Sequence, residues 1–235
     1  SVTLDDKTAP QISCPAPVTV QCSGDIPSPD VAAVQASDHC SVPVVSFVND
    51  QSTGSCPQII KRTYKAKDDC GNESFCTQLI TVQDTSPPVI SCPVLLTVQC
   101  PEDIPAPDIS KVTATDNCST PQVSFVRDVV SGSCPTVISR TYQAVDACGN
   151  VSGCTQTIRV DDTIPPQISC PAPVTVQCRE SVPAPDIQTV TASDNCGIQL
   201  VSFLGDKSTG KCPEIITRTY EATDHCGNKT TCTQT

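Results

Sequence analysis

The most constraining feature of this sequence is the spacing of its eighteen cysteines, which fall into three sets of six. The second set is the first set shifted by 78 residues, from Cys14 to Cys92, and the third repeats that shift, to Cys170. An internal repeat of this kind decides the architecture before any local pattern does, because each copy folds as one small unit. The sequence therefore predicts a tandem array of a six-cysteine module. In the first copy the cysteines are Cys14, Cys22, Cys40, Cys56, Cys70 and Cys76.

Each copy opens with an aspartate that is followed by a proline pair, at residues 84–88 and 162–166, or by its remnant, at residues 6–10. These recurring starts predict repeats at 6–83, 84–161 and 162–235. They also predict an end strand of a preceding repeat at 1–5 and a truncated last strand in the third repeat. Residues 1–5 align with the end of a repeat. The favoured interpretation is a stretch of a longer array. The alternative is that a neighbouring molecule donates residues 1–5 as a strand to the third repeat.

Even numbers of cysteines at strict spacing in a small module indicate disulfides and an oxidising compartment. Zinc is disfavoured, because the closest cysteines, such as Cys70 and Cys76, have five residues between them and the chain has only two histidines. A 78-residue module with 3% aromatic residues and no tryptophan or methionine has a small hydrophobic core and requires disulfide bonds for its stability. The expected location is therefore extracellular or on a cell surface.

The charge and the motifs exclude several function classes. A net charge of −11 and a pI of about 4.4 disfavour nucleic acid, which requires a basic face. No run approaches 18 apolar residues, so no membrane span is expected in this segment. The sequence has no G-x-S-x-G, H-E-x-x-H or phosphate-loop motif. We therefore expect a protein that is not an enzyme and that requires no cofactor.

Short runs in which apolar and polar residues alternate indicate strands, and Pro, Asp, Asn and Gly bound them. Helix is disfavoured because 22 prolines punctuate the chain and no long stripe of helical period appears. Each module is thus expected to be a two-sheet sandwich. The residues expected to point inward in the first repeat are Val18, Val20, Val34, Ala36, Val45, Phe47, Ile60, Tyr64, Ala66, Ile80 and Val82.

Three motifs resemble one known family. They are Asp-Thr-x-Pro-Pro-x-Ile-Ser-Cys-Pro at the start of a repeat, Tyr-x-Ala-x-Asp-x-Cys-Gly-Asn in its middle and Cys-Thr-Gln-x-Ile-x-Val at its end. Together they are similar to the hyalin-type (HYR) immunoglobulin-like repeat, and the cysteine-rich version resembles repeats of very large surface adhesins of gliding bacteria. The basic pattern of that family has only the first and last cysteines, and the first repeat here has Ala9-Pro10 in place of the proline pair.

The resemblance implies an all-β fold of three tandem immunoglobulin-like β-sandwich modules, each with three disulfides, in an extended array. In such a sandwich, Cys14, Cys40, Cys70 and Cys76 lie at one end, and Cys22 and Cys56 lie at the other. This implies pairing within each repeat. The predicted disulfides are Cys14–Cys76, Cys22–Cys56, Cys40–Cys70, Cys92–Cys154, Cys100–Cys134, Cys118–Cys148, Cys170–Cys232, Cys178–Cys212 and Cys196–Cys226.

Aspartates recur where consecutive repeats meet, an arrangement similar to the joints of cadherin repeats. Calcium prefers carboxylate and carbonyl oxygens, so a Ca²⁺ site at each joint is one hypothesis. The alternative is that these aspartates cap turns and accept backbone hydrogen bonds. The residues are Asp6, Asp38 and Asp68 in the first repeat, Asp84, Asp116 and Asp146 in the second, and Asp162, Asp194 and Asp224 in the third.

Four asparagines, Asn72, Asn117, Asn150 and Asn228, lie in N-glycosylation sequons. For those in Cys-Gly-Asn, which are Asn72, Asn150 and Asn228, a tight turn is the favoured explanation. If the source is a gliding bacterium, a sugar on Thr163 is an equal alternative.

The most plausible function is part of an extracellular stalk or filament, in which the Asp-Thr-x-Pro-Pro linkers hold adjacent repeats semi-rigidly. The expected partners are neighbouring repeats of the chain and, as a hypothesis, other copies in a fibre. The second candidate is a binding module whose repeats hold glycan, protein or calcium. A third, a multi-headed protease inhibitor, is disfavoured because the segments before Cys56, Cys134 and Cys212 show no tuned reactive residue.

Overall fold

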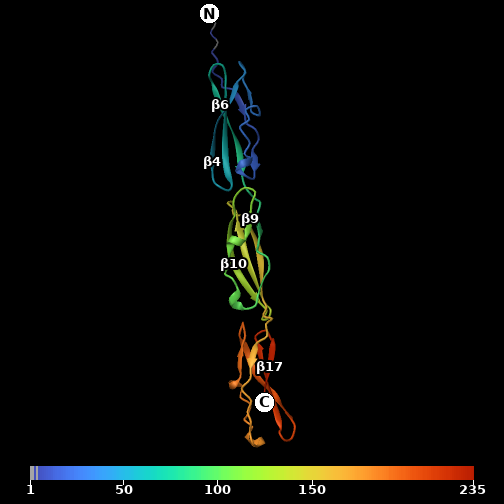
Figure 1. Cartoon of the computed structure of the whole chain (residues 1–235). Coiled ribbons are helices and arrows are strands. Elements are labelled where there is room, and N and C mark those ends of the chain that lie inside the picture. Colours follow the sequence, from blue (N-terminus) through green and yellow to red (C-terminus); the bar gives the residue numbers. More distant parts are fainter. Residues whose placement is uncertain (1–2, 4) are drawn as a thin grey trace. The chain divides into compact units, whose positions relative to one another are not determined.

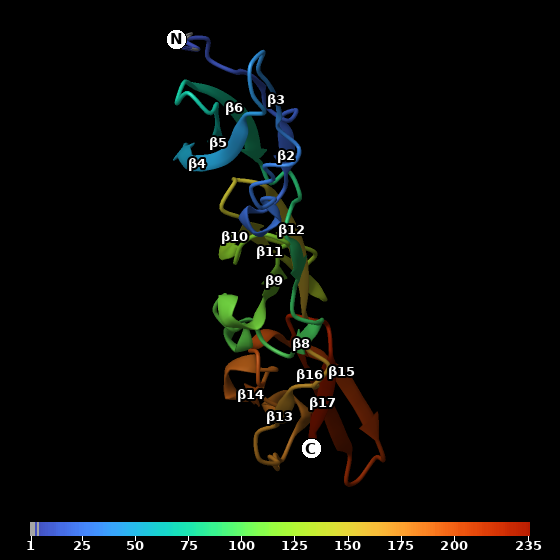
Figure 2. The same cartoon turned by 90° about the horizontal axis from the view of Figure 1, so that it is seen from above.

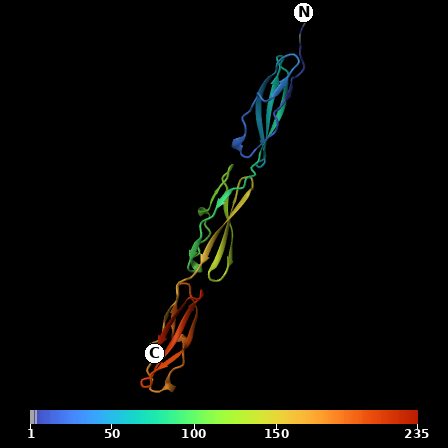
Figure 3. The ribbon, with the colours of Figure 1, turned by 90° about the vertical axis from the view of Figure 1, so that its right-hand side faces the viewer.

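The computed structural model describes residue 3 and residues 5–235. Residues Val2 and Leu4, on which the predicted end strand depends, lie outside the described part. Within that part the chain forms seventeen strands and five single turns of 3₁₀-helix, without an α-helix (Figures 1 and 3). None of the helical turns among these residues is long and apolar enough to cross a bilayer. The prediction of an all-β fold is confirmed.

The first repeat contains two layers of β-sheet. A small sheet pairs β1 (Gln11–Ser13) with β3 (Gln35–Ser37). A larger sheet has the order β2 (Val18–Val20), β6 (Glu73–Val82), β5 (Gln58–Lys67) and β4 (Val44–Thr53), in which β2 runs parallel to β6 (Figure 2). Strand β1 packs against β5 and β6, so the two sheets form a sandwich. The turn η1 (Ser23–Asp25) follows β2.

The second and third repeats use the same plan. The second consists of β7 (Val89–Ser91), β8 (Leu96–Val98), η2 (Pro101–Asp103), η3 (Ile109–Lys111), β9 (Thr113–Thr115), β10 (Gln122–Ser131), β11 (Thr136–Val145) and β12 (Val151–Val160). The third consists of β13 (Gln167–Ser169), η4 (Arg179–Ser181), η5 (Ile187–Thr189), β14 (Thr191–Ser193), β15 (Ile198–Thr209), β16 (Ile215–Asp224) and β17 (Lys229–Gln234). Its last strand is shorter, and residues 174–176, which correspond to β2, are not in a strand.

The core is small and follows the predicted alternation. Ile60, Tyr64 and Ala66 of β5 and Ile80 and Val82 of β6 are buried. One predicted core residue is largely solvent-accessible: the Phe47 side chain is 40% exposed. The reason is its position on β4, the edge strand of the larger sheet, where its ring meets that of Tyr64 in a T-shaped contact with 6.3 Å between centroids.

A buried arginine completes the core of every repeat. Arg62 has the same strand phase as Ile60 and Tyr64, so its side chain points inward, and it is only 2% exposed. Its guanidinium donates to both carboxylate oxygens of Asp50, at 2.9 and 2.8 Å, and to the carbonyl of Pro27, at 2.6 Å. A buried cation is tolerated because such paired, bidentate contacts replace its hydration. The same arrangement recurs at Arg140–Asp128 and Arg218–Asp206.

The chain divides into two compact units. The first comprises residues 1–91, 112–124 and 143–154, and the second comprises 92–111, 125–142 and 155–235. The division runs through the second repeat. The joint between the first and second repeats therefore lies within the first unit, and the joint between the second and third repeats lies within the second unit.

Candidate functional site: the disulfide-linked joints

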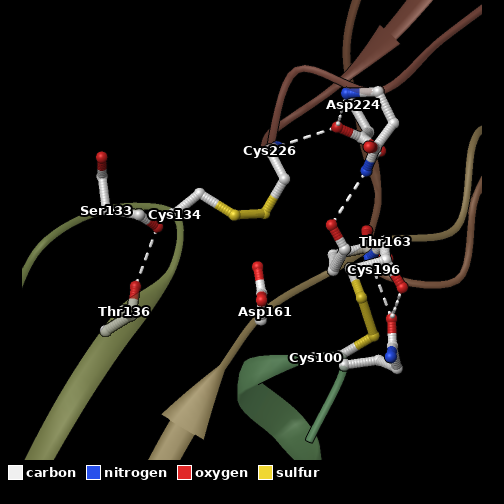
Figure 4. The surroundings of a disulfide bond; sticks show 12 residues. Cys100, Ser133, Cys134, Thr136, Asp161, Thr163, Cys196, Asp224 and Cys226 are labelled. Atoms are coloured by element: carbon white, nitrogen blue, oxygen red, sulfur yellow. Dashed lines mark hydrogen bonds between the residues drawn. A yellow bond between two sulfur atoms is a disulfide. The ribbon is translucent and has the colours of Figure 1, made fainter.

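Two disulfides cross each joint between repeats. At the first joint, Cys22 pairs with Cys118 and Cys56 pairs with Cys148, with Cα–Cα distances of 5.0 and 5.2 Å. At the second joint, Cys100 pairs with Cys196 and Cys134 pairs with Cys226, at 5.1 and 5.2 Å (Figure 4). Each joint therefore has three covalent connections, which are the polypeptide linker and two bridges.

One disulfide closes a repeat on itself. Cys14 pairs with Cys76 and Cys170 pairs with Cys232, which are two of the pairs that the sequence predicted. Cys92 and Cys154 are also disulfide-bonded, and their pairing with each other remains a prediction. Among the described residues, four cysteines are free and exposed: Cys40 and Cys70 in the first repeat, and Cys178 and Cys212 in the third.

The remaining predicted pairings are wrong in this structure, and so is the count of three disulfides within each repeat. The pairs that do not form are Cys22–Cys56, Cys100–Cys134, Cys118–Cys148, Cys196–Cys226, Cys40–Cys70 and Cys178–Cys212. The predicted pairing within a repeat is wrong because consecutive repeats meet end to end. The trailing end of one repeat carries the positions of Cys22 and Cys56. It meets the leading end of the next repeat, which carries the positions of Cys40 and Cys70. Each sulfur finds its partner across that boundary. Once Cys14 and Cys76 are paired with each other, two cysteines remain at each end of a repeat, and this match was the signal that sequence reasoning missed.

Hydrogen bonds position the cysteines of the Cys22–Cys118 bridge. The backbone N–H of Cys22, just before η1, donates to the Asp25 carboxylate at 3.3 Å. Across the joint, the carboxylate of Asp116 accepts from the N–H of Cys118 at 3.0 Å, and the Asn117 amide donates to both sulfurs, at 3.4 and 2.9 Å. At the second joint the Asn195 amide donates to Cys100 Sγ and Cys196 Sγ, at 3.2 and 2.8 Å. Both bridges are therefore supported by the loop after the Asp116 or Asp194 position.

The asparagine of each Cys-Gly-Asn turn ties the linker to the leading end. Asn150 Nδ2 donates to the carbonyl of the linker residue Asp84 at 3.1 Å and to the carboxylate of Asp146 at 2.7 Å. Asn228 makes the same contacts with Asp162 and Asp224, at 2.9 and 2.8 Å. Gly149 supplies the turn with a φ of 87°. In the first repeat Asn72 donates to Asp6 and Asp68 in the same way. The nitrogen that a glycan would modify is thus engaged in hydrogen bonds.

A second tie holds the linker from the trailing end. The side-chain carbonyl of Gln21 accepts from the N–H of Thr85 at 3.0 Å, and that of Gln99 accepts from the N–H of Thr163 at 3.0 Å. Since Gln21 and Gln99 each belong to the repeat before the linker, the linker is fixed to both repeats that it connects. Thr163, the proposed site of an O-linked sugar, is exposed in this linker.

The predicted aspartate clusters form in part. Asp84, Asp116 and Asp146 have ligand oxygens within 4.8 Å of one another, as the sequence predicted for a joint. At the other two leading ends, the corresponding groups are Asp6 and Asp38 with Cys40, and Asp162 and Asp194 with Cys196. Asp68 and Asp224 do not belong to these groups among the described residues, and their carboxylates accept from Asn72 and Asn228.

Hydrogen bonds lower the pKa of two of these carboxyl groups, those of Asp146 and Asp116. Burial raises the pKa of Asp146, but hydrogen bonds from the side chain and backbone of Asn150 outweigh this, so its pKa lies below the ordinary value. Burial also opposes the charge of Asp116, and the N–H groups of Cys118 and Ser119 lower its pKa in the same manner. One oxygen of Asp116, Oδ2, is buried without a hydrogen-bond partner, and so is Oδ2 of Asp194.

No model of a known protein family matches the chain. Solved cadherin structures are similar over most of its length. Protocadherin gammaB7 EC3–6, from a cis-dimer structure, has 15% identity and a TM-score of 0.34, covering 98% of this chain and 77% of that chain. Human CDH23 EC21–23 has 13% identity and a TM-score of 0.35, covering 97% and 99%. Drosophila N-cadherin EC1–4 has 14% identity and a TM-score of 0.29, covering 96% and 74%.

Proposed function

We propose that this chain is a segment of an extracellular stalk or filament whose β-sandwich repeats are locked to one another covalently. The observation that carries the proposal is the pair of disulfides across each joint, Cys22–Cys118 with Cys56–Cys148 and Cys100–Cys196 with Cys134–Cys226. A single linker permits bending and twisting about one point. Three covalent connections at separate points remove most of that freedom, so each joint resists both motions.

The linker contacts support the same role. Asn150 and Gln21 hold the linker residues Asp84 and Thr85 from opposite sides of the joint. Because the linker backbone is hydrogen-bonded to both repeats, one orientation of the two repeats relative to each other is favoured. The disulfides maintain that orientation when these hydrogen bonds open. A chain built in this way transmits tension through its bridges and presents few mobile backbone segments to proteases.

The compartment follows from the disulfide chemistry, because bridges in this number persist in oxidising surroundings. The motif resemblance to cysteine-rich hyalin-type repeats supports a cell-surface setting and a membership among bacterial gliding adhesins, where such repeats serve as stalk. The function is mechanical and not enzymatic. The sequence supplies no catalytic motif, and the same two bridges recur at both joints.

The test of this proposal is whether the joint is rigid because of its bridges. Residual dipolar couplings of the oxidised chain are expected to fit one alignment tensor across the first two repeats. The variant C22S/C118S/C56S/C148S keeps both Cys14 and Cys76 and loses only the bridges of the first joint, so its repeats are expected to require two tensors. The variant C14S/C76S, which keeps the joint bridges, is the matched control. Independent alignment of the repeats in the wild-type chain would refute the mechanical role.

A second candidate function is calcium binding at the joint, favoured by one observation. Asp84, Asp116 and Asp146 place three carboxylate groups together, and Oδ2 of Asp116 is buried without a hydrogen-bond partner. Calcium takes six to eight oxygens. Both oxygens of Asp146 already accept N–H groups, so the carboxylates of Asp84 and Asp116 would hold the ion and other oxygens would complete its shell.

Isothermal titration of the oxidised chain with Ca²⁺, in parallel with the Asp116→Asn variant, tests this second candidate. Binding that is lost in the variant, together with a melting temperature that falls on addition of chelator, supports calcium. An unchanged melting temperature and no heat of binding remove it and leave the aspartates as turn-capping groups.

A further inference from the structure

The outward face of the larger sheet in the first repeat carries a line of lysines. Strand β5 lies between β4 and β6 in that sheet, and its residues alternate between the core and the solvent side. Lys61, Lys65 and Lys67 have the outward phase, opposite to that of the buried Arg62 and Tyr64. At about 3.3 Å per residue, the line from Lys61 to Lys67 is about 20 Å long. The outward side of β4, β5 and β6 is called the lysine face below.

Side chains of the two neighbouring strands flank the lysines. On the β6 side, the register places Phe75 beside Lys65 and Leu79 beside Lys61. Phe75 is 57% exposed and Leu79 is 42% exposed, so both are apolar groups in contact with solvent. On the β4 side the flanking residues carry hydroxyl and amide groups, and they are Ser46, Asn49 and Gln51.

The lysine face has an excess of positive charge. Lys65 and Lys67 share the carboxylate of Glu73, with Nζ–Oε1 distances of 3.1 and 3.3 Å. Lys61 forms no ion pair with any residue in the described part of the chain. Three ammonium groups therefore face one carboxylate, on a chain whose net charge is −11. A local excess of one sign attracts a ligand of the opposite sign, here an anion.

The fold does not require these side chains. The four inward residues from Ile60 to Ala66 are Ile, Arg, Tyr and Ala in every repeat, whereas the outward residues of the same strands change. The lysines and the aromatic ring are therefore specific to the first repeat. At the positions of Lys61, Lys65, Lys67 and Phe75, the second repeat has Ser139, Gln143, Val145 and Gly153, and the third has Thr217, Glu221, Thr223 and Thr231.

The corresponding face is open to solvent in a repeat that has another repeat on each side of it in the chain. In the second repeat, Val151, Thr155 and Thr157 occupy the positions of Glu73, Thr77 and Leu79. Val151 is 54% exposed, and both threonines are exposed. The exposure of this face is thus a property of the repeat and does not depend on what adjoins it.

The chemistry of the lysine face favours a linear polysaccharide that carries carboxylates. Glu73 already shows one carboxylate held between two of the lysines. The neighbouring hydroxyl and amide groups can both donate and accept hydrogen bonds, as sugar hydroxyls require. The exposed Phe75 ring offers an apolar surface to the C–H groups of a sugar ring. An extended peptide would instead pair with a free strand edge, which β5 lacks because it is paired on both sides.

We propose that the lysine face binds a linear polysaccharide of uronic acids. The polysaccharide lies along β5, with its carboxylates on Lys61, Lys65 and Lys67 and one sugar ring on Phe75. Such a site attaches the side of the first repeat to an acidic polysaccharide, which a stalk alone does not do. The site uses none of the bridges across the joints, so it does not rest on the proposed function.

The experiment titrates the oxidised, ¹⁵N-labelled chain with an oligosaccharide of galacturonic acid, in the presence of a chelator that removes calcium. Amide shifts are expected on β4, β5 and β6, and the dissociation constant is expected to rise at least fivefold between about 50 and 300 mM salt. The variant K61Q/K65Q/K67Q is expected to raise the dissociation constant at least tenfold at low salt. Phe75→Thr, which introduces the residue of the third repeat, is expected to raise it at least threefold.

The matched control is K111Q/R127Q/K207Q, which removes the same number of positive charges from exposed positions outside the lysine face. Its dissociation constant is expected to lie within twofold of the wild-type value. Equal loss of affinity in this control would overturn the proposal, because the attraction would then depend on net charge alone. An absence of binding, or shifts confined to other parts of the chain, would overturn it as well.

Two further ligands test the class of partner. Neutral dextran is expected to cause no shifts on the lysine face, and polyglutamate of the same length is expected to bind at least fivefold more weakly than the oligosaccharide. Polyglutamate that binds as tightly would assign the face to an acidic protein and refute the polysaccharide. The variant C22S/C118S/C56S/C148S is expected to bind as the wild type does, so a failure of the joint and a failure of this site are distinguishable.

Discussion

The disulfide pattern sets how far the chain can extend under force. We count the shortest covalent path between the termini. It runs from Ser1 to Cys22, crosses to Cys118, continues to Cys134, crosses to Cys226 and ends at Thr235, and it contains 21, 16 and 9 residue steps, 46 in all. At about 3.4 Å per extended residue this path reaches about 160 Å, whereas the fully reduced chain of 235 residues reaches about 800 Å.

The greatest extension of the oxidised wild-type chain does not by itself distinguish disulfides across the joints from disulfides within the repeats. Bridges only within repeats, with Cys14–Cys76 and its two counterparts, would give a path of 48 steps, because the linkers between them are short. The variant C14S/C76S separates the two patterns. The bridges across the joints leave its path at 46 steps. Pairing within repeats, with Cys22–Cys56 now the first bridge, would lengthen it to 76 steps, or by about 100 Å.

The assay is single-molecule stretching between residues 1 and 235, in a background in which Cys40, Cys70, Cys178 and Cys212 are serine. We expect oxidised wild type and C14S/C76S to stop at the same extension, about 160 Å, and both to reach about 800 Å once reduced. A limit near 260 Å for oxidised C14S/C76S would refute the pairing across joints and the mechanical argument that depends on it.

Three further predictions concern single side chains. Arg140→Ala strands the Asp128 carboxylate and is expected to cost about 2–4 kcal/mol in urea unfolding of the oxidised chain, against less than about 1 kcal/mol for the exposed Arg159→Ala. Asn150→Ala leaves the linker carbonyl of Asp84 and the Asp146 carboxylate of the second repeat without this donor and is expected to cost about 1–3 kcal/mol, and wild-type Asn150 is expected to carry no glycan in the intact mass. The lowered pKa of Asp146 adds stability above the ordinary carboxyl value, near 3.9, that is lost as pH falls through the lower folded value, so acid unfolding should be shallower in Asp146→Asn.

Strand periodicity alone was enough to predict most of the core. Ile60, Tyr64, Ala66, Ile80 and Val82 are buried as the alternation requires. The alternation of apolar and polar residues predicts on which face of the sheet a side chain lies, but it does not predict how completely other residues cover that face. For this reason Phe47, which lies on the edge strand, is exposed. The inward phase of Arg62 was also visible in the pattern, but its buried pairing with Asp50, twelve residues earlier, depends on the register between β4 and β5.

The candidate site was predicted less completely. The aspartates at 84, 116 and 146 do come together, because they occupy loops at one end of a sandwich. The Asn150 contacts that tie the linker to the turn were not foreseen, since a Cys-Gly-Asn sequence indicates a turn but not what its side chain will reach. The 66-residue separation of the two partners recurs in all three repeats, but any two positions of a strict repeat keep a fixed separation, so the sequence did not single out this contact.

The amino-acid sequence by itself determined the repeat, its strands and the approximate ends at which its cysteines lie, because these depend on local spacing and alternation. Only the tertiary structure decided which sulfurs meet. A disulfide requires two Cα atoms within about 4.4–6.8 Å, and that distance depends on which faces of successive repeats are brought together. For Cys22 and Cys56 the partner lies in the next repeat, so the bridges that the spacing suggested within a module instead join one module to another.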